Sequence, residues 1–139
     1  MTRYFDASAL VKLGVSEAES MALETLVETR PEPAITSAVA ITEVGVSLAR
    51  AGSAIAERVV ATAGWITLPG IAVLGMPVTM ELCRSAASLG ARLNLRSLDA
   101  IHVATAEAAR ETLSEVVTYD KAMIVACREL GLPVASPGA

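Results

Sequence analysis

Four of the 15 acidic residues stand in contexts unlike an ordinary solvated helix face: Asp6, Glu43, Asp99 and Asp120. Asp6 and Asp120 each follow a short apolar segment that predicts a β-strand. In open parallel sheets, ligands bind at the carboxyl ends of the strands, so both carboxylates are expected at such an edge. For each taken alone, a helix N-cap is the structural alternative, because aspartate favours that position.

Glu43 and Asp99 lie in apolar segments that predict helices. Val39 and Val46, one helical turn before and after Glu43, place its carboxylate on an apolar face, where an ionised group is costly unless it is paired or bound to a metal. Asp99 opens the segment 99–106, whose following turns are almost wholly apolar. For Glu43, the alternative is a place on a solvated stripe of its helix. For Asp99, the alternative is a favourable interaction with the helix dipole in the first turn.

The coincidence of four such residues points to a metal site. Two carboxylates about 4 Å apart repel each other by about 4 kcal/mol at an effective dielectric constant of about 20. Such a cluster is tolerated only around a cation or with some groups protonated. Oxygen ligands favour Mg²⁺ or Mn²⁺ over zinc, and Mg²⁺ held by a few carboxylates suits phosphodiester cleavage. We therefore predict that all four residues bind metal and act in catalysis, with Asp6 and Asp99 foremost.

Several neighbouring side chains could support this chemistry. Ser8 and Thr118 can hold a carboxylate or a water, although local turn bonding explains them equally well. Arg96 is a candidate phosphate contact, with a solvated surface charge as the alternative. His102 lies one helical turn after Asp99 and could serve as a general acid. A packed histidine is the favoured interpretation, because metal-assisted hydrolysis needs no histidine base.

The predicted elements alternate between short strands and helices. Apolar segments predict strands at 3–5, 34–36, 71–74, 116–118 and 133–134. Helical patterns predict a turn at 8–13 and helices at 16–29, 37–50, 53–63, 79–89, 97–110 and 121–130. Ser16 and Glu19 form a capping box for one helix, and Gly90 is expected to end another. This order predicts an α/β fold around a mostly parallel sheet, in a single domain over 1–139.

Composition restricts the possible partners. Hydrophobic residues make up 53% of the 139 residues, so we expect an apolar surface patch for self-association or a partner. The net charge of -4 argues against general electrostatic binding of nucleic acid, but not against a nuclease whose acids are neutralised by metal.

Residues 59–80 carry no charge, yet Pro69 and Gly70 interrupt them, and we interpret them as a helix end, a turn and a buried strand rather than a membrane span. With no secretory signal in the first residues, we expect a cytoplasmic protein without membrane contact.

Five segments together resemble a known family, and they span nearly the full length. They are 4–13, with its D-x-S-A-L-x-K-L pattern, 41–50, 95–106, 117–123 and 130–138, and the third is the most specific. The chain resembles the VapC toxins, PIN-domain ribonucleases of bacterial and archaeal toxin–antitoxin systems. A haloacid-dehalogenase-type phosphatase fits less well, because it needs D-x-D after its first strand and Ser8 stands at the third position.

The resemblance implies a PIN domain, a three-layer α/β/α sandwich with a short-stranded, mostly parallel sheet. It implies that Asp6, Glu43, Asp99 and Asp120 bind one or two Mg²⁺ or Mn²⁺ ions and that the substrate is RNA, often tRNA or rRNA. It also implies a homodimer and a VapB-like antitoxin that forms a higher-order complex. We expect an antitoxin helix in a groove of the first helices, about 10–27 and 39–48. A non-catalytic PIN-like RNA- or protein-binding module is the alternative, against which the four retained acids speak.

Overall fold

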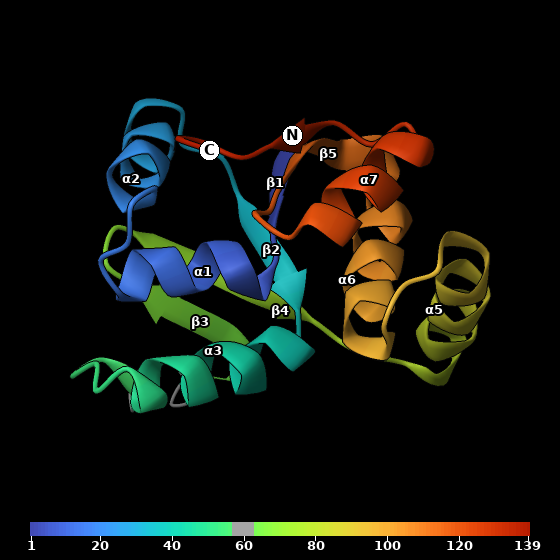
Figure 1. Ribbon diagram of the computed structural model, residues 1–139, viewed down its shortest axis with the longest axis horizontal. Coiled ribbons are helices and arrows are strands. Elements are labelled where there is room, and N and C mark those ends of the chain that lie inside the picture. Colours follow the sequence, from blue (N-terminus) through green and yellow to red (C-terminus); the bar gives the residue numbers. More distant parts are fainter. Residues whose placement is uncertain (57–62) are drawn as a thin grey trace.

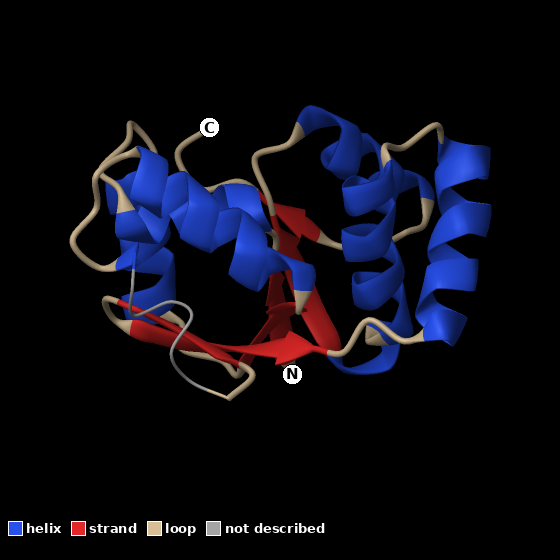
Figure 2. Cartoon of the chain, turned by 90° about the horizontal axis from the view of Figure 1, so that it is seen from below, coloured by secondary structure: helices blue, strands red, loops and turns tan. Residues whose placement is uncertain are grey.

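A sheet of six short strands forms the centre of the molecule (Figures 1 and 2). The computed structural model describes residues 1–56 and 63–139. The strand order is β3-β4-β2-β1-β5-β6, and every neighbouring pair is parallel except β3 and β4. The strands are β1 (Thr2–Phe5), β2 (Ala34–Ser37), β3 (Trp65–Leu68), β4 (Ile71–Met76), β5 (Leu113–Val117) and β6 (Val134–Ala135).

Helices cover both faces of this sheet (Figure 1). They are α1 (Ala7–Gly14), α2 (Ser20–Thr29), α3 (Val39–Arg50), α5 (Met80–Leu93), α6 (Ser97–Ala108), α7 (Lys121–Glu129) and the 3₁₀ helix η1 (Arg110–Thr112). Phe5 of β1 packs in the core under α1, α2 and α3, whereas its neighbour Tyr4 packs in the core under α6 and α7. Successive residues of one strand thus serve opposite faces. This arrangement confirms the three-layer α/β/α sandwich.

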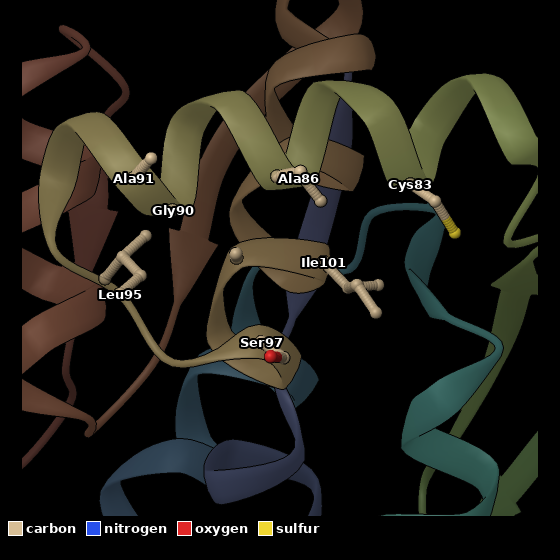
Figure 3. A pocket seen from close by; sticks show the side chains of 9 residues that line it. Cys83, Ala86, Gly90, Ala91, Leu95, Ser97 and Ile101 are labelled. Atoms are coloured by element: carbon tan, nitrogen blue, oxygen red, sulfur yellow. The ribbon is translucent and has the colours of Figure 1, made fainter.

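Helix α5 packs on the outer side of α6 through small side chains. Ala86 of α5 and Ala100 and Ala104 of α6 form a small apolar cluster of their own. Between the two helices lies a groove of about 360 Å³ (Figure 3). It is lined by alanines, Cys83, Gly90, Leu95, Ser97 and Ile101.

The edge hairpin was only partly predicted. The strand at 71–74 is confirmed and extends to Met76. β3 was missed because the residues before Pro69 were interpreted as a helix end and a turn. β3 pairs with β4 in antiparallel register through a turn in which Gly70 has φ +80°, a conformation that favours glycine. Of the helix expected at 53–63, residues 57–62 lie outside the described residues. Within the described ranges, no helix has the length and apolar character needed to cross a membrane.

Two predicted helix ends were wrong for identifiable reasons. Helix α2 begins at Ser20, and the predicted capping box fails because the Glu19 carboxylate pairs with Lys12 Nζ at 2.8 Å instead. Helix α5 continues through Gly90 to Leu93 and ends at Asn94 in the left-handed region. Gly90 lies inside the helix, where a Cβ would come within 3.0 Å of the Ala100 Cβ. It therefore permits the close approach of α5 and α6.

Candidate metal and active site

Asp6 is a buried carboxylate held by several donors at the end of β1. Its side chain is only 3% exposed. Ser8 Oγ donates to Oδ1 at 2.7 Å, Thr118 Oγ1 donates to Oδ2 at 2.6 Å, and the Ala9 amide donates to Oδ1 at 3.0 Å as an N-cap contact. Burial raises the pKa of Asp6, although the three hydrogen bonds oppose that rise. Asp6 therefore does act as an N-cap, as the structural alternative predicted. This local role does not exclude a second role as a metal ligand.

Glu43 is hydrogen-bonded to a buried histidine. Its side chain on α3 is 27% exposed, and its Oε1 lies 2.7 Å from His102 Nε2. His102 is 2% exposed, and its Nδ1 lies 2.6 Å from the Tyr4 hydroxyl. His102 is thus a packed histidine with both ring nitrogens hydrogen-bonded, which confirms the favoured interpretation of this residue.

Asp99 and Asp120 lie in more open surroundings. Asp99, in the first turn of α6, has a 16% exposed side chain and one contact of 3.3 Å from Arg96 Nε. Arg96 itself is 85% exposed. Asp120 caps α7, and its Oδ1 accepts from the Met123 amide at 2.9 Å. As for Asp6, the expected N-cap role is present.

Thr118 connects Asp6 with Asp120. Its hydroxyl donates to Asp6 and accepts from the backbone amide of Asp120 at 3.1 Å. Strands β1 and β5 are parallel and pair Phe5 with Val117, so the residues that follow them emerge at the same edge of the sheet. The two aspartates therefore share the carboxyl end of the central strands, as their sequence positions predict.

Glu43 lines two clefts, which also carry the candidate residues Ser8, Arg96 and Asp99. One cleft, of about 340 Å³, is lined by Ser8, Lys12 and Glu43 among others. The second, of about 320 Å³, is lined by Glu43, Arg96 and Asp99. Hydrogen bonds thus connect Asp6 with Asp120, and Glu43 connects the cleft beside Ser8 with the cleft beside Asp99.

The donor set suits a hard cation. In the described part of the chain, no three His, Cys, Asp or Glu side chains are gathered closely enough to form a ready ligand cluster. Mg²⁺ commonly needs only one or two carboxylates, because it keeps several waters. A carboxylate offers about four lone-pair positions, and Asp6 uses three of them in the hydrogen bonds described above. Burial raises the pKa of Tyr4 most, and the negative charges of Asp6 and Glu43 raise it further. A cation bound near these two carboxylates would offset their charge.

Tyr4 was not predicted as part of the site. It is fully buried, its ring meets the His102 ring edge-on at 6.0 Å between centroids, and its hydroxyl is hydrogen-bonded to that histidine. Its position two residues before Asp6 in a strand was a usable signal. A buried tyrosine hydroxyl usually has a hydrogen-bond partner, and alternate strand residues share one face.

Comparison with known proteins gives one family. The PIN domain family matches residues 3–129. Ribonuclease VapC47 of Mycobacterium tuberculosis is 39% identical over 98% of this chain and 97% of its own length. Ribonuclease VapC35 of the same organism is 40% identical over 97% and 96% of the two chains. The chain therefore belongs to the PIN-domain family, in the branch of the VapC proteins.

Solved structures agree in fold. The crystal structure of Mycobacterium tuberculosis VapC20, a sarcin–ricin-loop-cleaving toxin, aligns with a TM-score of 0.71 at 19% identity, over 89% of this chain and 94% of that one. A toxin–antitoxin complex from Klebsiella pneumoniae aligns with a TM-score of 0.68 at 20% identity, over 97% of both chains. At these identities the similarity supports the fold alone.

Proposed function

We propose that this chain is a Mg²⁺- or Mn²⁺-dependent endoribonuclease that hydrolyses RNA phosphodiester bonds, with tRNA or rRNA as the substrate. The observation that carries the proposal is Asp6, a nearly buried carboxylate held by three donors at the carboxyl end of β1. Its hydrogen bonds and its N-cap role support it locally, but a buried carboxylate remains costly, and a bound cation would offset its charge. Membership of the PIN-domain family supports the same chemistry.

The chain's own residues have separable roles in this proposal. Asp6, Glu43, Asp99 and Asp120 hold the metal, with Asp6 and Asp99 as its principal ligands. Ser8 and Thr118 orient Asp6 by hydrogen bonds of 2.7 and 2.6 Å. When bound, the cation offsets the negative charge that develops on the phosphodiester in the transition state.

Arg96 is the proposed phosphate contact. It lies at the rim of the cleft that includes Glu43 and Asp99, and it is 85% exposed, so its guanidinium is free to leave Asp99 for a phosphate oxygen. The acidic net charge makes such local cations useful, because the surface as a whole does not attract RNA.

The proposed setting is a toxin–antitoxin pair in the cytoplasm. The chain would form a homodimer and be neutralised by a VapB-like antitoxin in a higher-order complex. The groove expected for the antitoxin needs one revision, because Leu10 is fully buried in the core and cannot line a surface. Exposed apolar side chains on the same helices are Met21, 78% exposed, and Val46, 41% exposed. Val46→Asp is therefore the variant that tests antitoxin binding at this groove.

Cleavage mapping tests the proposal most directly. Brief expression of the parent chain followed by sequencing of RNA 5′ ends should reveal new ends that Asp6→Asn does not produce. The purified chain should cleave the same RNA with Mg²⁺ or Mn²⁺ and not with EDTA. A parent chain that binds RNA or a protein partner but cuts nothing, and shows no Mn²⁺ affinity, is instead a non-catalytic PIN-like module.

A further inference from the structure

Three side chains, Tyr4, His102 and Glu43, form a line of hydrogen bonds from the core to the surface where the two clefts lie. It begins at the Tyr4 hydroxyl in β1, passes 2.6 Å to His102 Nδ1, and continues 2.7 Å from Nε2 to Glu43 Oε1. Tyr4 and His102 are 0% and 2% exposed, whereas Glu43 lines both clefts. The line therefore joins fully buried groups to a carboxylate at the surface.

The direction of each hydrogen bond follows from the chemistry of the groups. An ionised carboxylate only accepts, so His102 Nε2 carries a hydrogen and donates it to Glu43. In the neutral ring, Nδ1 then has a free lone pair and accepts from the Tyr4 hydroxyl. The carboxylate thus sets this tautomer of His102, and the Tyr4 hydroxyl stabilises it by donating to Nδ1.

Glu43 needs such a contact more than Asp6 does. Asp6 has a short side chain that three donors fix in a buried position. Glu43 has one more rotatable bond and is 27% exposed, so it loses more conformational entropy when it is held in one orientation. The ring of His102 is fixed by burial and by its edge-on contact with Tyr4, which makes it a rigid donor.

We propose that Tyr4 and His102 are positioning residues that hold the Glu43 carboxylate ready for the metal. The inference rests on the proposed function, because it takes Glu43 as a metal ligand. Tyr4 and Asp6 belong to the same short segment of chain, so β1 sets the position of both carboxylates, one directly and one through His102. Groups that orient metal ligands in this way typically contribute 10–100-fold to metal affinity or activity.

The experiment measures Mn²⁺ affinity, by titration with detection of free Mn²⁺, together with cleavage and thermal unfolding. Tyr4→Phe removes one hydroxyl and should weaken Mn²⁺ binding by about 2- to 10-fold, as expected for one hydrogen bond. His102→Leu should weaken it by about 10- to 100-fold. His102→Gln should recover a large part of that loss, because its amide NH₂ can donate to Glu43 and its carbonyl oxygen can accept from the Tyr4 hydroxyl. Thr105→Val, which removes a hydroxyl bonded within α6 at 2.7 Å to Ile101 O, is the matched control and should bind Mn²⁺ like the parent.

A double-mutant comparison separates positioning from packing. In a Glu43→Gln background, Tyr4→Phe and His102→Leu should change Mn²⁺ affinity no further, while any effect on thermal unfolding should persist. The inference is overturned if Tyr4→Phe and His102→Leu fold, yet bind Mn²⁺ and cleave like the parent. It is also overturned if their effects are the same with and without Glu43. If the parent neither binds Mn²⁺ nor cleaves RNA, the proposed function itself is refuted. If the parent does both and the variants behave like it, only this inference is refuted.

Discussion

The two sides of the candidate acidic site are built differently. On the side of β1 and β5, Asp6 is 3% exposed and its oxygens accept from three donors. On the side of α6, Asp99 has a 16% exposed side chain and one contact of 3.3 Å, from an arginine that is itself 85% exposed. One carboxylate is fixed before any ligand arrives, and the other remains adjustable.

The difference follows from where each residue lies. A residue that follows a buried strand is surrounded by backbone amides and hydroxyls that can donate to it. A residue in the first turn of a helix at the rim meets solvent and long, mobile side chains. A preorganised carboxylate needs little rearrangement when a cation binds, whereas a rim residue can rearrange to accommodate a substrate. We therefore expect changes on the buried side to have the larger effects.

Loss of the buried carboxylate should have the largest effect. Asp6→Asn should reduce RNA cleavage below detection while preserving the fold, because it removes the charge that is fixed for metal binding. Asp99→Asn should also abolish cleavage under physiological Mg²⁺, but some activity should return at high Mn²⁺ if its side of the site is adjustable. Cleavage assays over a metal titration, with circular dichroism as the folding check, decide the point. Equal cleavage by parent and Asp6→Asn would refute the assignment.

Removal of a donor to Asp6 should have an intermediate effect. Thr118→Val keeps the shape of the side chain but removes the 2.6 Å hydrogen bond to Asp6 and the acceptor for the Asp120 amide. We expect Mn²⁺ affinity or cleavage to fall by about 10- to 100-fold. Thr105→Val is the control, since it replaces another buried threonine by valine away from the acids. If both variants behave alike, Thr118 has no special role in holding Asp6.

In metal-free buffer, the pH dependence of the free energy of unfolding should reveal the buried carboxylate of Asp6. Burial raises the pKa of Asp6, so the folded state binds this proton more tightly than the unfolded state does. The contribution of Asp6 to the free energy of unfolding should therefore decrease as pH rises from the ordinary carboxyl pKa, about 3.9, through the raised value. Denaturant unfolding in EDTA at several pH values should show this slope in the parent. Asp6→Asn should lack that component of the slope and be more stable than the parent at neutral pH.

Loss of the rim arginine should have the smallest effect. Arg96→Ala should change the free energy of unfolding by less than about 0.5 kcal/mol, because an exposed ion pair contributes little. If Arg96 contacts phosphate, the variant should raise KM for RNA severalfold, leave kcat nearly unchanged and weaken the salt dependence of cleavage. Arg50→Ala, at the far end of α3, is a control of the same charge. A large loss of stability in Arg96→Ala would show that the two sides are less different than the structure suggests.

Local sequence patterns determined the elements and the candidate acids. The alternation of short apolar strands with helices was enough for the α/β fold, and the positions of Asp6 and Asp120 after strands placed them at the carboxyl edge. Strand β3 was missed, because its segment was interpreted as a helix end and a turn and it forms a strand by pairing with β4. The end of α5 was missed because Gly90 serves the close packing against Ala100, a contact absent from the local pattern.

Only the tertiary structure decided how the acids are held. The sequence contains no sign that Tyr4 bonds to His102, 98 residues away, or that His102 bonds to Glu43, 59 residues away. Burial likewise separates Asp6 from Asp99, although both are aspartates near a helix start. These properties depend on which surfaces meet when β1, α3 and α6 pack together, and such contacts leave no periodic signal in the chain. The sequence thus determines which carboxylates are available, and the packing determines which of them are preorganised.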